Sequence, residues 1–286
     1  MNAIILAAGT SSRFVPLSLE KPKGLLVVKG EVLIERQIRQ LIDAGIDDIT
    51  IVTGYKADMF AYLRDKYGVE TVFNGDYYRY NNTSSIIRVI DKLGDTYICC
   101  SDHYYKRNVF GEPANDSYYS ALYAKGATKE YCLSLDDKDY ITGVDIGGKD
   151  AWYMAGHVFF TQAFSESFKK IITEAYNLES VRYGYWEDVY IEHINELPMQ
   201  LRRYAEDDII EFDTLDELRQ FDESYVDDTR SPVVKEICEL LNCEERELSG
   251  FKRVKDIGDN LVFMFCFGDQ VYTYDDRDSL KIELYQ

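Results

Sequence analysis

Short apolar runs alternate with amphipathic stretches along the first hundred residues, and this alternation constrains the fold more than any other feature of the sequence. The apolar runs have the length of strands buried on both faces of a sheet, and the stretches between them carry apolar residues at helical spacing. We expect strands at 2–8, 48–54, 69–73 and 96–102, and helices at 31–44, 57–68 and 82–94. Strands and helices that alternate in this way form βαβ units. The sequence therefore predicts an α/β fold with a doubly wound, mostly parallel, Rossmann-like sheet.

The pattern changes after this region. Runs typical of strands and separated by turn residues indicate antiparallel additions to the sheet, at 118–125, 131–135, 140–146 and 152–160. Two further helices are expected at 162–177 and 186–195. The stretch 209–222 predicts a strand and a short helix, with Asp213 or Thr214 as the N-cap.

The composition changes again at "DDTRSP" (227–232), an acidic stretch with a proline that is typical of a linker. Beyond it we expect a helix and a pair of β-hairpins with turns at "GDN" (258–260) and "GDQ" (268–270). The sequence thus predicts a larger domain at 1–228, complete in itself, and a small α+β module at 229–286.

The chain is strongly acidic, with 51 acidic and 32 basic side chains and a formal net charge of −19. Such a surface repels phosphate backbones and anionic lipids, so we expect neither nucleic acid nor a membrane surface as a partner. No apolar run approaches the ~20 residues that span a bilayer, and the N-terminus lacks a signal-peptide pattern. The six cysteines form no CxxC pair, which favours buried, reduced thiols. These features predict a cytoplasmic protein.

The segment "LAAGTSSRFVPLSLEKPKGLL" (6–26) leaves the carboxyl end of the first predicted strand, where open α/β sheets bind ligands. Residues 10–30 contain four basic side chains and one acidic one, against the trend of the chain. Gly9 allows backbone N–H groups to approach phosphate oxygens, and Arg13 and Lys23 supply positive charge. Its prolines stiffen the segment. We predict a phosphate-binding loop that packs little core, rather than an ordinary surface loop with solvated lysines.

The same segment resembles the LAAGxGxRxxPxTxxxPKxL signature of the nucleoside-triphosphate transferase family, whose members join nucleoside triphosphates to sugar phosphates or phosphorylated alcohols. It departs from the signature at Ser11, which replaces a glycine, so a turn with positive φ costs more there. Two further stretches, "YNNTSSI" (80–86) and "GYWEDVYIEHI" (184–194), resemble bacterial CTP:phosphocholine cytidylyltransferases. The similarity runs from residue 1 to about 225. It implies that CTP and phosphocholine give CDP-choline and pyrophosphate, a reaction of phospholipid or cell-surface choline metabolism.

The resemblance also assigns the nucleotide to particular residues. Its expected binding residues are Leu6, Ala8, Gly9, Thr10, Ser11, Arg13, Lys23, Asn81 and Asn82. Of these, Gly9, Arg13 and Lys23 would hold the triphosphate, and Arg13 and Lys23 are the candidate catalytic cations. Leu6, Ala8 and the two asparagines would border the cytosine and the ribose.

Transfer between phosphates brings several negative charges together, so the chemistry requires a divalent cation and positive side chains more than a base. Mg²⁺ prefers one or two carboxylates together with phosphate oxygens and water. Asp102 follows the fourth predicted strand and is the candidate catalytic ligand, with Glu187 or Asp188 as a second ligand. Alternatively, Asp102 is a turn residue and the other two are ordinary acids of a first helical turn. His103 is accompanied by no nucleophile pattern, so we expect a direct in-line displacement.

The trimethylammonium group of choline is recognised by aromatic faces and a nearby carboxylate rather than by hydrogen-bond donors. Tyr131, Tyr185 and Trp186 fall where the resemblance puts the acceptor pocket, so they are the candidate choline-binding residues. The alternative for each of them is core packing.

Two other functions remain open. A sugar-1-phosphate nucleotidyltransferase would need polar groups for sugar hydroxyls in the acceptor pocket, and a non-catalytic nucleotide sensor would contact a partner through the C-terminal module. The presence of Arg13, Lys23 and Asp102 favours an enzyme. The stretch 237–274 resembles the start of a choline-kinase-like N-lobe, but it lacks a glycine-rich loop, so no kinase activity is expected. Use of phosphoethanolamine, protein partners and the oligomeric state are left open.

Overall fold

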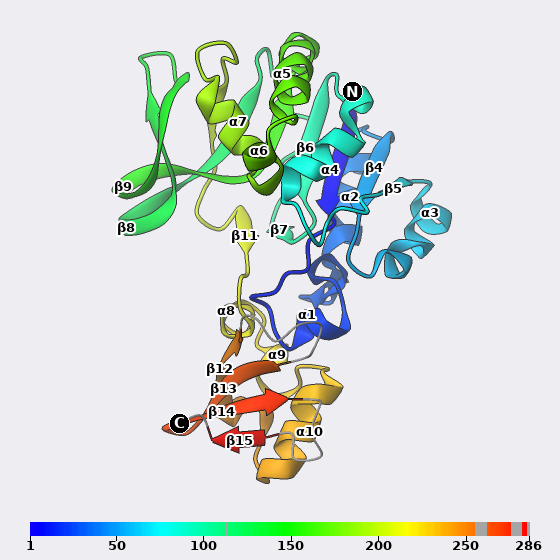
Figure 1. The fold of residues 1–286 in the computed structure, drawn as a ribbon, viewed down its shortest axis with the longest axis vertical. Coiled ribbons are helices and arrows are strands. Elements are labelled where there is room, and N and C mark those ends of the chain that lie inside the picture. The colour runs from blue at the N-terminus through cyan, green and yellow to red at the C-terminus, as the bar shows by residue number, and fades with distance from the viewer. Residues whose placement is uncertain (113, 255–261, 276–281, 285–286) are drawn as a thin grey trace. The chain divides into compact units, whose positions relative to one another are not determined.

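The computed structural model describes residues 1–112, 114–254, 262–275 and 282–284. By their contacts, the residues group into two compact units. The first unit comprises Met1–Gly9 and Leu33–Glu211, and the second comprises Thr10–Val32 and Phe212–Gln286. Each unit has its own sheet (Figure 1).

A seven-stranded sheet forms the centre of the first unit, in the order β10-β8-β9-β6-β1-β4-β5. Its strands are β1 (Asn2–Ala7), β4 (Ile49–Thr53), β5 (Glu70–Phe73), β6 (Thr96–Cys100), β8 (Tyr118–Leu135), β9 (Ile141–Phe160) and β10 (Gln200–Arg203). Strands β6, β1, β4 and β5 run parallel, whereas β9 pairs antiparallel with both β6 and β8. The predicted mostly parallel sheet with antiparallel additions is confirmed.

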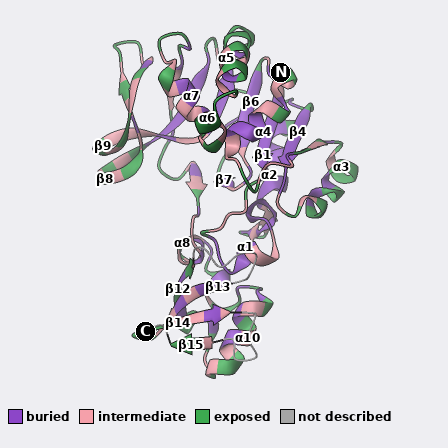
Figure 2. Cartoon of the chain, in the orientation of Figure 1, coloured by how far each residue is buried: buried purple, intermediate pink, exposed green. Residues whose placement is uncertain are grey.

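Three of the parallel strands, β1, β4 and β6, form where the sequence is apolar on both faces. Ile5 in β1 lies beside Ile51 of β4 and Cys99 of β6, and all three side chains are buried. Figure 2 shows the same strands as a continuous buried layer. Because both faces are covered, the carboxyl ends of these strands are the places where polar groups can gather.

The antiparallel part of the sheet differs from the prediction, because two long strands replace the four short ones. The pairing of β8 with β9 changes register at several points, one of them between Ala124 and Ala127. Gly126 lies within this shift with φ of +85°, a conformation that glycine adopts without steric cost. Bulges of this kind let a strand continue through residues that otherwise indicate a turn.

The helices of the first unit are shorter than the predicted ranges. They are α2 (Leu33–Asp43), α3 (Tyr62–Tyr67), α4 (Asn82–Arg88), α5 (Gln162–Ala175), α6 (Glu179–Tyr183) and α7 (Trp186–Glu192), with the 3₁₀ turns η2 (Ala57–Phe60) and η3 (Ile90–Lys92). The helix predicted at 82–94 ends early because Val89 leaves helical geometry, with φ of −123°. Two short strands, β7 (His103–Tyr105) and β11 (Ile209–Glu211), form a separate antiparallel ribbon.

The second unit includes the basic loop that follows β1. The segment Thr10–Val32 forms α1 (Leu17–Glu20), η1 (Lys23–Leu25) and a hairpin of β2 (Val27–Val28) and β3 (Glu31–Val32). Its buried apolar side chains are Phe14, Val15, Leu17, Leu25, Leu26 and Val28. The prediction that this loop packs little core is therefore wrong. These side chains come from separate short turns, so they follow no helical or strand periodicity from which their burial could be predicted.

The rest of the second unit is the C-terminal part of the chain. It contains α8 (Leu215–Phe221), α9 (Ser224–Asp227), α10 (Pro232–Leu241), η4 (Glu245–Glu247) and a four-stranded antiparallel sheet of β12 (Leu248–Arg253), β13 (Val262–Phe267), β14 (Gln270–Asp275) and β15 (Ile282–Leu284). Thr214 caps α8. The "GDQ" turn joins β13 to β14 as predicted, whereas the "GDN" turn lies outside the described residues.

The boundary between the compact units does not coincide with the predicted domain boundary at 228, because residues 212–228 group with the C-terminal part. Whether 1–228 is complete in itself stays a prediction. Among the described helices, none has the length and the apolar character needed to cross a membrane.

Candidate active site

The carboxyl end of β1 is closely packed against its neighbours. The carbonyl oxygen of Leu6 accepts a hydrogen bond from Ser101 N at 3.0 Å, and that of Ala8 accepts one from Tyr55 N at 3.0 Å. A Cβ atom at Gly54 would lie 2.7 Å from the Ala8 oxygen, so this position admits only glycine. The backbone at the predicted nucleotide-binding residues Leu6 and Ala8 is therefore held in place, and Gly9 continues directly into the basic loop.

The basic loop begins with a strained turn. Ser11 has φ of 48°, in the left-handed region that the family signature fills with glycine, and its carbonyl oxygen accepts a hydrogen bond from Phe14 N at 2.8 Å. The backbone thus makes the turn that the signature requires, although the residue is a serine.

Two cations of the loop face one carboxylate within the second unit. An oxygen of Asp213 lies 2.7 Å from the Arg13 guanidinium, and its other oxygen lies 3.9 Å from the Lys23 ammonium. The Lys23 side chain is only 4% exposed, and its ammonium lies 5.6 Å from the centre of the Phe14 ring. In the sequence, Asp213 is recognisable only as a candidate helix cap. A single acid next to a capping threonine gives no signal that could have identified this contact.

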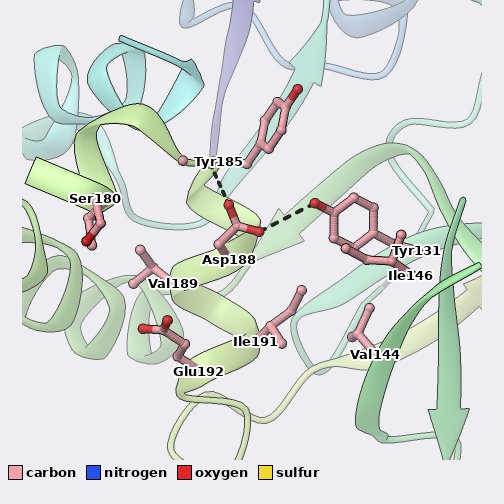
Figure 3. Close-up of a pocket in the computed structure, with 11 residues that line it drawn as sticks. Tyr131, Val144, Ile146, Ser180, Tyr185, Asp188, Val189, Ile191 and Glu192 are labelled. Carbon is pink, nitrogen blue, oxygen red and sulfur yellow. Dashed lines mark hydrogen bonds between the residues drawn. The ribbon is translucent and has the colours of Figure 1, made fainter.

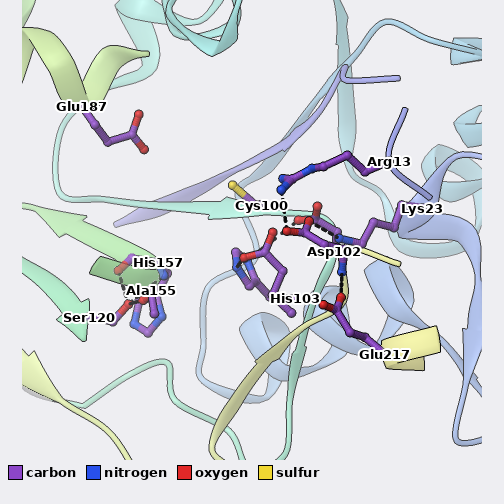
Figure 4. A network of polar contacts seen from close by, with 12 residues as sticks. Arg13, Lys23, Cys100, Asp102, His103, Ser120, Ala155, His157, Glu187 and Glu217 are labelled. Carbon is purple, nitrogen blue, oxygen red and sulfur yellow. Dashed lines mark hydrogen bonds and ion pairs between the residues drawn. The ribbon is translucent and has the colours of Figure 1, made fainter. Parts of the chain in front are cut away.

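Asp102 lies at the turn that follows β6, where β1, β4 and β6 end on the same side. Its carboxylate is 25% exposed and lies 4.0 Å from His103 Nδ1, while His103 Nε2 lies 3.4 Å from the Glu211 carboxylate (Figure 4). The Gln37 amide donates hydrogen bonds to the carbonyl oxygens of Cys100 and His103, both at 2.8 Å. The turn that carries Asp102 is therefore fixed from both sides.

Asp102 has the chemistry of a magnesium ligand. A partly exposed carboxylate at the carboxyl end of a strand offers the hard oxygen that Mg²⁺ prefers. Cys100 and His103 place possible ligand atoms within 4.8 Å of it. Burial raises the pKa of the Cys100 thiol well above its usual value, so the thiol stays protonated and is a poor ligand for a hard cation. The residues present thus fit a Mg²⁺ ion held through Asp102.

The two candidates for the second metal ligand lie in different surroundings. In the part of the chain that the structure describes, the group of possible ligands around Asp102 includes neither Glu187 nor Asp188. Glu187 accepts hydrogen bonds from Asn82 Nδ2 at 3.1 Å and from the Tyr119 hydroxyl at 3.3 Å. Burial raises the pKa of Glu187 to about 7. Metal binding by either acid stays a prediction.

Asn81 and Asn82 hold the start of α4 and connect it to α7. The side chain of Asn81 accepts a hydrogen bond from Asn82 N at 2.9 Å and caps α4. Asn82 Oδ1 accepts one from Trp186 N at 2.9 Å, while its amide nitrogen donates to Glu187. These contacts give the two asparagines a structural role, and their predicted position beside cytosine and ribose is not tested by them.

The two predicted choline-binding tyrosines line one pocket together with the acids Asp188 and Glu192 (Figure 3). The pocket has a volume of about 420 Å³. The Tyr131 hydroxyl lies 3.4 Å from Asp188 Oδ1, and the other oxygen of Asp188 accepts a hydrogen bond from Tyr185 N at 2.8 Å. The Tyr185 side chain is 46% exposed. Apolar side chains form most of the remaining lining, namely Val144, Ile146, Val181, Val189 and Ile191, and Ser180, Gly184 and Glu192 complete it.

Trp186, the third predicted choline-binding residue, lies in the core instead. Its side chain is 2% exposed, and it stacks on Tyr119 with ring centres 6.1 Å apart and planes 13° apart. Phe160 and Phe168 contact the indole edge-on. Trp186 is not among the pocket-lining residues. The prediction is wrong because adjacent residues at the start of a helix point in different directions, here Tyr185 outward and Trp186 inward.

The chain combines a mostly parallel sheet, a basic loop after its first strand and a carboxylate after a neighbouring strand, and this combination is typical of nucleotidyltransferases. Residues 3–103 match the MobA-like NTP transferase domain. The choline-phosphate cytidylyltransferase of Streptococcus pneumoniae is 33% identical over 223 residues, which cover 78% of this chain and 97% of that relative. The chain belongs to the nucleoside-triphosphate transferase family, in the group that contains this enzyme.

Other comparisons agree with the assignment. The 2-aminoethylphosphonate cytidylyltransferase of Lancefieldella rimae is 34% identical over 229 residues, covering 79% of this chain and 93% of that protein. The solved structure of the Streptococcus pneumoniae CTP:phosphocholine cytidylyltransferase superposes with a TM-score of 0.75, covering 78% of this chain and 98% of that one. The inositol-1-phosphate CTP transferase from T. maritima, with a TM-score of 0.59 and 15% identity over 76% of this chain and 90% of that one, shares the fold.

Proposed function

We propose that the protein transfers CMP from CTP to phosphocholine, which forms CDP-choline and releases pyrophosphate. The observation that carries the choice of acceptor is the pocket in which Tyr131, Tyr185 and Asp188 lie together. Aromatic faces beside a carboxylate attract a quaternary ammonium without requiring hydrogen-bond donors from it. The similarity to choline-phosphate cytidylyltransferases over most of their length supports the same choice.

On the nucleotide side, we assign the triphosphate to Arg13, Lys23 and the backbone N–H groups of residues 9–11. The left-handed turn at Ser11 and the buried position of Lys23 support this assignment, because both reduce the number of conformations that the loop must give up on binding. Leu6, Ala8, Asn81 and Asn82 remain the proposed border of cytosine and ribose.

The reaction that we propose is a single in-line displacement. A phosphate oxygen of phosphocholine forms a bond to the α-phosphorus of CTP, the bond from that phosphorus to the bridging oxygen of the β-phosphate breaks, and pyrophosphate leaves with the electron pair. Arg13 and Lys23 stabilise the negative charge that develops on the transferring and leaving groups. No side chain forms a covalent intermediate.

Enzymes of this family generally use a divalent metal ion. We propose that Asp102 holds Mg²⁺, with Glu187 or Asp188 as the second protein ligand. When bound, Mg²⁺ neutralises phosphate charge and polarises the reacting phosphoryl group. The Gln37 hydrogen bonds keep the Asp102 turn in one conformation for that purpose.

A second acceptor, 2-aminoethylphosphonate, is favoured by the Lancefieldella rimae relative. It carries a primary ammonium, which can donate hydrogen bonds to the carboxylate of Asp188. A sugar phosphate fits less well, because the pocket walls are mostly aliphatic and aromatic. The non-catalytic alternative is disfavoured by the family assignment, since the matched relatives are enzymes.

The remaining assignments are also proposals. We place the catalytic side chains in residues 1–228 and regard 229–286 as an accessory module. Its likeness to the start of a choline-kinase-like N-lobe and the cytoplasmic location of the protein remain predictions from the sequence.

The test is to follow pyrophosphate release from each nucleoside triphosphate with phosphocholine, phosphoethanolamine, 2-aminoethylphosphonate and glucose 1-phosphate. We expect CTP with phosphocholine to give the highest kcat/KM. A higher kcat/KM with 2-aminoethylphosphonate would show that this compound is the preferred acceptor, while the proposed CMP transfer would still stand. Release with glucose 1-phosphate alone, or with none of the acceptors, would overturn the proposal.

A further inference from the structure

The loop that carries Arg13 and Lys23 is fastened to residues near the start of the C-terminal module. The segment Thr10–Val32 groups with Phe212–Gln286 in one compact unit. Besides the ion pairs of Arg13 and Lys23 with Asp213, hydrogen bonds connect the two segments at three places, which lie on either side of Lys23. They involve Glu20 before the lysine, and Val27 and Lys29 after it.

The first contact holds the residue that ends α1. The hydroxyl of Ser231 donates a hydrogen bond to Glu20 Oε1 at 2.5 Å, and Val233 N donates to the same oxygen at 3.4 Å. Ser231 is fully buried and also accepts a hydrogen bond from Val234 N at 3.1 Å, which makes it the N-cap of α10. A carboxylate at the N-terminus of a ten-residue helix is favoured by the helix dipole. Glu20 is thus fixed three residues before Lys23.

The second contact holds the chain just after η1. The carbonyl oxygen of Val27 accepts hydrogen bonds from the Tyr225 hydroxyl at 2.8 Å and from Arg230 Nη1 at 3.0 Å. The Arg230 guanidinium lies 4.3 Å from the centre of the Tyr225 ring and donates to Ser224 Oγ at 2.8 Å. Both donors to Val27 are therefore held by contacts of their own.

The third contact fixes the hairpin turn that follows. Lys29 N donates a hydrogen bond to Asp222 Oδ2 at 2.6 Å, and the other oxygen of Asp222 accepts from the Ser224 hydroxyl at 2.8 Å. Lys29 itself has φ of 50°. The backbone from α1 to the hairpin is consequently bound at both ends, with Lys23 in the middle.

We infer that Arg230 and Ser231 are positioning residues for the triphosphate-binding loop, so that the start of the C-terminal module sets the affinity of the enzyme for CTP. This inference rests on the proposed function. It goes beyond the family resemblance, which ends at about residue 225, before both residues. A loop held in its binding conformation loses less entropy when the nucleotide binds. A displacement of about 1 Å in a charged group can cost roughly 100-fold in rate.

The experiment compares the full-length protein with Arg230→Ala, Ser231→Ala and the double variant. Arg246→Ala is the matched control, because Arg246 lies in the same unit and pairs with Asp227 and Glu244 but makes none of the three contacts with the loop. CTP binding is measured by calorimetry in the absence of acceptor, and KM is measured for both substrates. Hydrogen exchange reports the mobility of residues 10–32.

We expect the double variant to bind CTP roughly 10-fold more weakly, because the released loop loses more conformational freedom when the nucleotide binds. Its KM for phosphocholine should be unchanged, and amide exchange in 10–32 should be faster. Ser231→Thr, which keeps the hydroxyl, should restore most of the affinity lost in Ser231→Ala. The inference would be overturned if Arg246→Ala lost as much affinity for CTP as the double variant. It would also be overturned if both KM values rose in proportion to a loss of thermal stability, because Arg230 and Ser231 would then act only through folding. CTP binding by the variants as tight as by the parent would overturn it while the proposed function stands. A parent protein that binds no CTP would overturn both.

Discussion

The Lys23 ammonium lies 3.9 Å from the Asp213 carboxylate although the lysine side chain is almost completely buried. A buried cation that keeps its charge needs an anion nearby. The loop therefore holds Lys23 as a fixed charge, and not as a flexible surface lysine. Such a group can stabilise the developing charge of phosphoryl transfer without reorganising.

Replacement of Lys23 should abolish most of the activity. Lys23→Met keeps much of the buried aliphatic stem and removes the charge, so it separates catalysis from packing better than Lys23→Ala does. We expect kcat/KM to fall by roughly 10²–10³ with the fold retained. Lys21→Met, two residues earlier, is the control and should keep most of the activity. Near-normal turnover in a folded Lys23→Met protein would contradict the assignment.

Asp102 should determine the requirement for metal. Asp102→Asn replaces a charged ligand by a neutral amide, so we expect activity to be lost and not to be recovered at higher Mg²⁺. Glu187→Gln and Asp188→Asn, measured side by side over a Mg²⁺ titration, identify the second ligand. If neither changes the Mg²⁺ concentration needed for half-maximal rate, the second ligand lies elsewhere in the chain.

The acceptor pocket should depend on Tyr185. Tyr185→Ala removes an aromatic face worth roughly 0.5–2 kcal/mol, so KM for phosphocholine should rise about 2- to 30-fold while KM for CTP stays the same. Tyr183→Ala is a matched control, because Tyr183 is half exposed on the neighbouring helix α6 but does not line the pocket. A change in both Michaelis constants would show that Tyr185 acts through the fold.

The sequence predicts those features that depend on local pattern. The parallel strands were predictable because residues such as Ile5 and Ile51 lie in continuous apolar runs, and the position of the basic loop followed from the end of β1. The burial of single residues could not be predicted in the same way. Lys23 is charged but buried, and Trp186 packs in the core beside an exposed Tyr185, because both depend on segments distant in sequence. The sequence also did not predict that two short strands would join around Gly126 into the single strand β8, because this joining depends on pairing with β9.

Glu187 should make the stability of the protein fall as the pH rises from about 4.5 to about 7. Burial raises its pKa from 4.5 to about 7 in the folded protein, so between these values the folded state binds more protons than the unfolded state. The free energy of unfolding then decreases with rising pH and becomes level above the folded pKa. The full effect of one group with this shift is up to about 3 kcal/mol.

Urea unfolding of the parent protein and of Glu187→Gln, across pH 4.5 to 8 and without ligands, measures this contribution. Glutamine cannot ionise, so the free energy of unfolding of the variant should not show this decrease with rising pH. The stability of the variant relative to the parent should therefore increase as the pH rises. Tyr119→Phe provides a second check, because it removes a hydrogen bond that favours the ionised carboxylate and should extend the loss to higher pH. Parallel stability curves for the parent and Glu187→Gln would mean that the carboxyl titrates normally, and that water reaches it in spite of its contacts with Asn82 and Tyr119.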